Sequence, residues 1–131
     1  SKAGFEIAYP TRRASHEFIV TMKDIKDKTG VTAMNLAKRL LDKGYHAPTT
    51  YFPMLVPECL LIEPAETESK ETLDAFVSSM KEILQEIEQQ PDMVKGAPHT
   101  MSVRKLDDVK AARELDLTWK PSALSKSQAS R

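Results

Sequence analysis

Three carboxylates crowd one short loop of this sequence. Glu63, Glu66 and Glu68 lie between an apolar run that ends at Ile62 and a helical pattern that follows Ser69. Carboxylates that lie close together raise one another's pKa and can then serve as general acids or bases. A loop between a buried strand and a helix is also a common place for a site. The simpler alternative, which the residues alone favour, is that these acids are exposed to water and interact with the helix dipole.

Histidine and cysteine supply weaker candidates. His46 follows the first predicted helix, where a neutral imidazole could contact a ligand, although a hydrogen-bonded loop histidine is the simpler interpretation. Cys59 opens an apolar strand without a basic neighbour to lower its pKa, so it is predicted to be a buried packing residue. His16 and His99 are far from His46 in the sequence, and no zinc-ligand spacing occurs, so no metal site is expected.

The overall composition argues against several classes of function. The 19 basic and 19 acidic residues balance, so the basic face that nucleic-acid binding needs is not expected. No apolar run is long enough to span a bilayer and the N-terminus lacks a signal-peptide pattern, so a cytoplasmic domain without membrane contact is expected. The 4 glycines are scattered, whereas a phosphate-binding loop needs clustered glycines.

Hydrophobic periodicity predicts the elements that must position these residues. Strands are predicted over residues 16–22, 50–52 and 59–62, and helices over about 32–43 and 69–90. Thr32 and Ser69 are predicted N-caps, and Gly44 is predicted to end the first helix in a left-handed conformation. Two amphipathic helices need one apolar sheet face to cover. The sequence therefore predicts an α+β fold, with a small, mainly antiparallel sheet that has helices on one face.

An ordered set of motifs resembles the glycine decarboxylase (P-protein) family of the glycine cleavage system. The matching segments are residues 16–20, 30–33, 36–42, 44–49, 51–53, 62–74, 95–99 and 102–113. Each motif alone is weak, but the ordered set covers about residues 5–119 and looks most like the second subunit of the two-subunit form. The sequence departs from the family at Ala65, where threonine is common, so a hydrogen bond from that position is not carried over.

The resemblance implies a fold-type-I pyridoxal-phosphate enzyme whose small C-terminal domain packs on a large cofactor-binding domain. Such enzymes release CO2 from glycine and pass the aminomethyl group to the lipoyl arm of the H-protein, with pyridoxal phosphate as the electron sink. The implied partners are the large domain of the same chain, the other P-protein subunit and the lipoylated H-protein. The family's Schiff-base lysine, in a His-Lys motif before a glycine-rich run, has no counterpart in this sequence. The cofactor lysine is therefore expected upstream, and the isolated fragment is expected to be inactive.

The resemblance also strengthens the case for two loops as lining of the substrate and lipoyl site. The residues implied are His46 and Thr49 in the loop after the first helix, and Glu63, Glu66, Thr67 and Glu68 in the acidic loop. Their expected role is to orient the substrate and the lipoyl arm, because the covalent catalyst lies elsewhere. Two other functions remain open, namely a stand-alone βαββα ligand-binding or regulatory module, or the small domain of an aminotransferase or desulfurase of the same fold type.

The expected domain organisation has four parts. Residues 1–15 are predicted to be an irregular lead-in from the missing large domain, and residues 16–90 the α+β small domain. Residues 91–119 are predicted to form a C-terminal tail that packs on the enzyme, with a short surface helix over about 105–113. The Ser-rich, polar residues 120–131 are predicted to be disordered.

Overall fold

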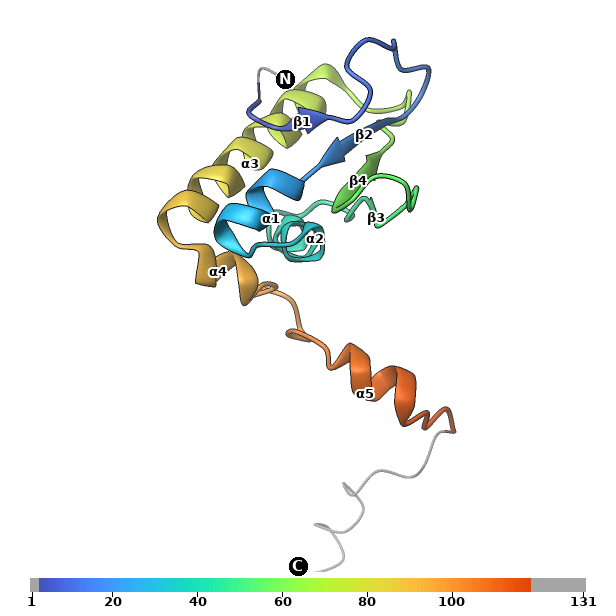
Figure 1. Cartoon of the computed structure of the whole chain (residues 1–131), viewed down its shortest axis with the longest axis vertical. Coiled ribbons are helices and arrows are strands. Elements are labelled where there is room, and N and C mark those ends of the chain that lie inside the picture. The colour runs from blue at the N-terminus through green and yellow to red at the C-terminus, as the bar shows by residue number, and fades with distance from the viewer. Residues whose placement is uncertain (1–2, 119–131) are drawn as a thin grey trace, which may run out of the picture.

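The computed structural model describes residues 3–118, which form one sheet flanked by helices and a C-terminal extension (Figure 1). In chain order the elements are β1 (Glu6–Ile7), β2 (Phe18–Thr21), α1 (Lys23–Thr29), α2 (Ala33–Asp42), β3 (Thr49–Thr50), β4 (Cys59–Ile62), α3 (Lys70–Gln89), α4 (Pro91–Lys95) and α5 (Asp108–Arg113). All three strand pairs are antiparallel, and the order β1-β2-β4-β3 places β2 and β4 in the interior of the sheet. The predicted α+β class is confirmed.

The core lies between the helices and one face of the sheet. Val20 of β2 pairs with Leu60 of β4, and both side chains are almost completely buried. The helices contribute fully or almost fully buried side chains to the same cluster, among them Leu36, Leu40, Ile83 and Ile87. Burial of each such side chain stabilises the fold by about 1.5–3 kcal/mol. The opposite face carries the half-buried Ile19 and Leu61, so the expected arrangement of helices on one face is confirmed.

The predicted helix boundaries agree with the capping contacts. Thr32 and Asn35 form a capping box, in which the Asn35 amide donates to Thr32 Oγ1 at 3.2 Å and the Thr32 amide donates to Asn35 Oδ1 at 3.0 Å. Gly44 adopts φ 84° just beyond α2, a left-handed conformation that favours glycine. Ser69 Oγ accepts a hydrogen bond from the Thr72 amide at 3.1 Å and so caps α3.

Three short elements, β1, α1 and α4, are not predicted by the sequence pattern. The prediction that residues 1–15 are irregular is wrong for Glu6–Ile7, which pairs with Val20 and Thr21 as the edge strand β1. A strand of two residues is too short to show an alternating pattern. The sequence pattern marks Lys23 to Lys28 only as charged and places a turn at Thr29-Gly30, whereas Lys23–Thr29 forms α1 and contains no buried residue. A helix without an apolar stripe gives no periodic signal, because its stability comes from its ends and its neighbours.

The packed body also extends beyond the predicted boundary at residue 90. Pro91 ends α3 as expected, but it also occupies the first turn of α4, where the missing amide costs nothing. Val94 and Ala97 are then buried against the rest of the body. The predicted surface helix over about 105–113 is confirmed as α5. The predicted disorder of residues 120–131 lies outside the described residues.

Glu58, which immediately precedes β4, contacts both α1 and the start of α2. Its Oε2 accepts the Ala33 amide at 2.9 Å, its Oε1 lies 2.8 Å from Lys26 Nζ, and its side chain is only 11% exposed. Glu58→Ala is expected to lower the free energy of unfolding by about 2 kcal/mol, because a charge-assisted bond to a helix N-terminus is lost. Glu58→Gln, which can still accept from the amide, is expected to lose about half as much. Urea denaturation of both variants tests this ranking, and equal losses would contradict it.

Candidate functional site

A pocket of about 410 Å³ lies where three segments of the chain meet. Residues 45–49, which follow α2, form one wall, and residues 61–65, at the end of β4, form the second. The third wall comes from the loop before α3 and from the first two turns of that helix. Segments that are far apart in the sequence thus converge on one concavity, which is the usual geometry of a small-molecule site.

Strand pairing explains why the two loops meet. Gly44 turns the chain back after α2 with its positive φ, and the chain then enters β3. Thr49 of β3 pairs with Leu61 of β4, so the residues that precede β3 lie beside those that follow β4. Ser69 then starts α3 by capping its first turn, which directs that helix back along the same side. The pocket is therefore a consequence of the sheet register and of one helix cap.

The pocket brings together most, but not all, of the residues suggested by the sequence. His46, Thr49, Glu63 and Glu68 line it, and each of them is exposed to solvent. Glu66 and Thr67 are also exposed but do not line the pocket. They occupy the turn that closes with the Glu68 amide donating to the Ala65 carbonyl at 3.0 Å. The spacing of the acidic loop in the sequence does not distinguish its lining residues from those of its turn.

The apolar walls of the pocket were not suggested by the sequence as site residues. Tyr45 and Phe76 pack edge to face with ring centroids 5.2 Å apart, and both line the pocket. Leu73, one turn before Phe76, is 38% exposed and lines the same wall. The periodicity of α3 predicts that Phe76 and Leu73 belong to the core stripe, and that signal hides their second role.

The charges around the pocket restrict what it can hold. Glu63 and Glu68 are its charged lining residues, His46 adds an imidazole, and the lining contains no lysine or arginine. Carboxylates accept hydrogen bonds, so the pocket suits a ligand that offers N–H or O–H donors or a positive charge next to an aliphatic part. A phosphate group is disfavoured, because phosphate sites need cationic side chains or clustered amides.

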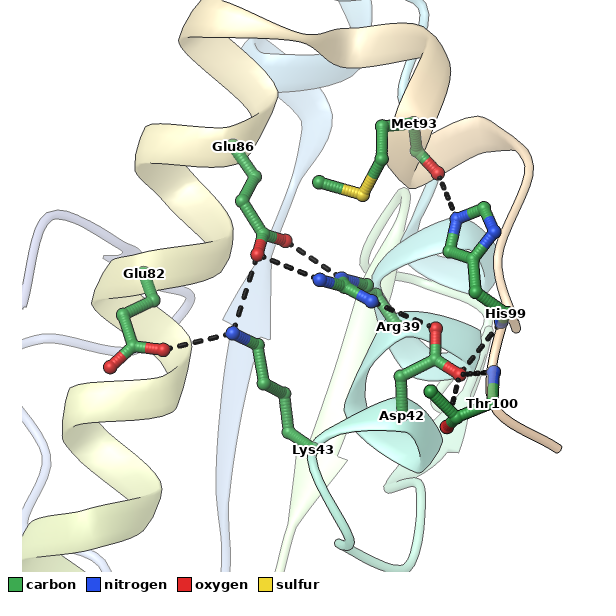
Figure 2. A network of polar contacts seen from close by, with 8 residues as sticks. All are labelled: Arg39, Asp42, Lys43, Glu82, Glu86, Met93, His99 and Thr100. Atoms are coloured by element: carbon green, nitrogen blue, oxygen red, sulfur yellow. Dashed lines mark hydrogen bonds and ion pairs between the residues drawn. The ribbon is translucent and has the colours of Figure 1, made fainter.

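A second polar cluster, none of whose residues lines the pocket, connects α2 to α3 and to the start of the C-terminal extension (Figure 2). Arg39 donates two hydrogen bonds to Glu86, each of 2.8 Å, and a third of 3.0 Å to Asp42. Asp42 Oδ1 accepts the His99 amide at 2.7 Å, the Thr100 amide at 2.8 Å and the Thr100 hydroxyl at 2.9 Å. The Asp42 side chain is only 1% exposed, so this carboxylate is buried with every contact satisfied.

The electrostatics of this cluster indicate a structural role. Burial alone would raise the pKa of Asp42, but hydrogen bonds from Thr100, Arg39 and His99 outweigh it and lower that pKa to about 2. The hydrogen bonds from Arg39 similarly hold the pKa of Glu86 below its ordinary value. Both acids therefore stay ionised and paired at neutral pH, and neither lines the pocket. The cluster fixes where the chain leaves the body.

The remaining candidates from the sequence have structural surroundings. Cys59 is buried, donates weakly to the Pro53 carbonyl at 3.6 Å, and has its pKa raised mainly by burial, which suits a packing residue. The His99 ring contacts the Met93 carbonyl at 2.8 Å. Among residues 3–118 no group of three or more His, Cys, Asp or Glu side chains is arranged to hold a metal ion. Within that same range no helix has the length and apolar character that crossing a bilayer requires.

Comparison with known proteins identifies close relatives. The family model described as "Glycine dehydrogenase, C-terminal domain" matches residues 2–104. The probable glycine dehydrogenase (decarboxylating) subunit 2 of Nitrosospira multiformis is 86% identical over 119 residues, which are 91% of this chain and 24% of that protein. The protein of the same description from Nitrosomonas europaea is 84% identical over 120 residues (92% and 25%), and that of Legionella pneumophila strain Lens is 67% identical over 119 residues (91% and 25%). The chain thus spans about a quarter of the length of these curated relatives.

Proposed function

Because the chain belongs to the family of glycine dehydrogenase C-terminal domains, we propose that it serves a complete glycine dehydrogenase (decarboxylating) as the domain that lines the mouth of the active site. The complete enzyme would release the glycine carboxyl group as CO2 and transfer the remaining aminomethyl group to a lipoyl arm. The family match favours this function over an aminotransferase or desulfurase domain, and the length of the relatives favours it over a stand-alone binding module.

The observation that carries the proposal is the convergence of two loops on one pocket. The loop after α2 contributes His46 and Thr49, and the loop after β4 contributes Glu63 and Glu68. The sequence and its family resemblance predict that both loops line the substrate site. Their meeting beside an apolar wall suits substrates that combine polar groups with an aliphatic chain, as a lipoyl arm does.

The described residues do not fit pyridoxal phosphate, the cofactor that the family uses. The cofactor needs a lysine for its Schiff base and cationic or amide donors for its phosphate, whereas the pocket is lined by Glu63 and Glu68 and by no lysine or arginine. The apolar groove on the other side of Phe76 has Lys81 as its one charged lining residue. We therefore assign the cofactor site to the part of the enzyme that precedes this domain.

Within this proposal the lining residues position substrates and exclude water. His46 and Thr49 offer hydrogen-bonding groups, and the carboxylates of Glu63 and Glu68 would attract an amino group and oppose the entry of anions. Glu66 and Thr67 lie on the outer turn of the acidic loop and would act at the rim, where a carrier protein approaches. None of these residues is assigned a covalent step.

The proposed partners follow from the same assignment. The names of the relatives describe a subunit 2, so the complete protein would assemble with a first subunit. It would also receive the lipoylated H-protein, whose arm must reach the pocket. The large domain of the same polypeptide would cover the side of the pocket that is open in the described residues.

The experiment is an exchange assay on the complete natural polypeptide together with its partner subunit, pyridoxal phosphate and the lipoylated carrier. Labelled bicarbonate is expected to exchange into the carboxyl group of glycine. A parallel reaction in which the isolated 131 residues replace the complete polypeptide is expected to show no exchange. Failure of the complete system, with carrier and cofactor verified, would contradict the proposal. A cofactor absorbance spectrum would then separate a sister enzyme from a binding module.

A further inference from the structure

The C-terminal arm, residues 101–118, extends away from the body of the domain (Figure 1). Every residue of the arm is exposed. Large apolar side chains recur along it and are between 38% and 84% exposed: Met101, Val103, Leu106, Val109, Leu115 and Leu117. A continuous segment with this much exposed apolar surface is typical of an interface, because scattered single apolar residues are the norm on a free surface.

The root of the arm is held in one place. The amides of His99 and Thr100, the last two residues before the arm, both donate to the buried carboxylate of Asp42. Arg39 holds that carboxylate from the other side and is itself held by Glu86 (Figure 2). The charge cluster therefore fixes the point at which the arm leaves the body.

The helix of the arm also lacks the packing that so short a helix needs. α5 has six residues, and Asp107 caps it by accepting the Lys110 amide at 2.9 Å. A helix of this length is marginal in water, and most helical stability in proteins comes from burial of an apolar face. Val109 in the helix and Leu106, which immediately precedes the Asp107 cap, are 61% and 54% exposed. The cap and these exposed apolar side chains suit a helix that is completed by a partner.

We propose that the C-terminal arm binds an apolar groove on the part of the complete polypeptide that precedes this domain. The relatives carry about three quarters of their length outside the matched segment, and the family is a C-terminal domain. The alignment with the Nitrosospira multiformis protein covers 119 of the 131 residues, too many to leave α5 out. The relatives therefore combine the arm with a large preceding part of the polypeptide, which could supply the surface that the arm binds.

A second copy of this domain is a poorer occupant. The apolar groove that the described residues offer beside β1 has a volume of about 290 Å³, which is small for a row of side chains as long as that of the arm. Charge gives no alternative means of attraction, because the arm carries 4 basic and 4 acidic residues. We therefore expect the arm to bind through apolar contacts in a groove that is longer than the one beside β1.

Hydrogen exchange in the complete polypeptide tests whether the arm is bound. Amides of residues 108–113 are expected to exchange at least tenfold more slowly in the wild type than in the double variant Leu106→Ser/Val109→Ser. The matched control is Lys105→Ser/Lys110→Ser, which shortens two side chains of the same arm and is expected to keep the protection. Equal exchange in the wild type and the apolar variant would overturn the proposal.

A photo-crosslinking amino acid at Val109 of the complete polypeptide identifies the occupant. The expected product joins the arm to a peptide that precedes this domain and keeps the mass of a single chain on a denaturing gel. A product with twice that mass, or with another protein, would overturn the proposal. Neither measurement depends on catalysis, so the arm and the proposed activity can fail independently.

Discussion

Replacing Asp42 by alanine is expected to lower the free energy of unfolding by about 3 kcal/mol, the range found when one partner of a buried ion pair is removed. The Asp42 carboxylate is 1% exposed and accepts hydrogen bonds from the His99 amide, the Thr100 amide and the Thr100 hydroxyl. Its loss leaves those donors without their acceptor. It also leaves Arg39 with only one of its two carboxylate partners, Glu86.

Urea denaturation measures this loss, and Asp27→Ala is the matched control. Asp27 is 59% exposed and pairs with Lys23 at 2.9 Å on the surface of α1. Its removal is expected to change the free energy of unfolding by less than about 1 kcal/mol, because exposed ion pairs contribute little. If the two variants lost equal stability, the Asp42 cluster would not be the anchor described above.

The same carboxylate makes stability depend on pH in acid. The folded-state pKa of Asp42 is about 2, below the ordinary value of 3.8. The contribution of the ionised carboxylate to the free energy of unfolding is therefore complete above about pH 4, and it is lost as the pH falls towards 2. The shift corresponds to about 2 kcal/mol. Wild type is therefore expected to lose about that much more stability than Asp42→Asn between pH 4 and pH 2, and parallel curves would contradict the pairing.

The sequence predicts the long elements because their signals are local. Thr32 and Ser69 cap the two main helices, and the apolar stripe from Leu73 to Ile87 defines α3 over almost its full length. The apolar run of residues 59–62 coincides with β4. In each case the residues that determine the element lie within it, or within one turn of it, so a pattern read along the chain is sufficient.

The contacts that the sequence does not predict join residues that are distant along the chain. Asp42 meets Thr100 across 58 residues, and Glu58 meets Ala33 across 25. No periodicity marks such a pair, because each partner is an ordinary polar residue in its own segment. Since these pairs fix the ends of α2 and the start of the C-terminal arm, the point at which the arm leaves the body follows from tertiary contacts alone.

The sequence predicts the candidate site only in part, because the site also depends on contacts between residues that are distant along the chain. His46 and Glu63 could be selected because their loops carry recognisable motifs, and the pairing of β3 with β4 then brings those loops together. The sequence could not separate Glu68, which lines the pocket, from Glu66, which does not. Which side chain of a loop turns inward depends on the turn geometry, and that geometry is set by the register of the sheet.

Filling the pocket is expected to lower glycine–bicarbonate exchange by the complete enzyme by about a hundredfold, the size of loss that small misplacement of a substrate causes. Ala65→Trp is the suitable change, because Ala65 lines the pocket, has a small side chain and lies outside any helix or strand. The indole would occupy the space between the two loops without disturbing the core, so the free energy of unfolding is expected to change little.

Leu55→Trp is the matched control, since it adds the same side chain to an exposed turn residue that does not line the pocket. It is expected to retain most of the exchange activity. If both variants were fully active, the pocket would not lie on the path of the substrates, although the domain would still belong to the enzyme.

The two KM values show which substrate the pocket holds. If Ala65→Trp raised the KM for the lipoylated carrier more than the KM for glycine, the pocket would admit the lipoyl arm. A groove that holds the arm affects the binding of glycine only indirectly. A larger effect on the KM for glycine would instead place the amino acid itself beside Glu63 and Glu68.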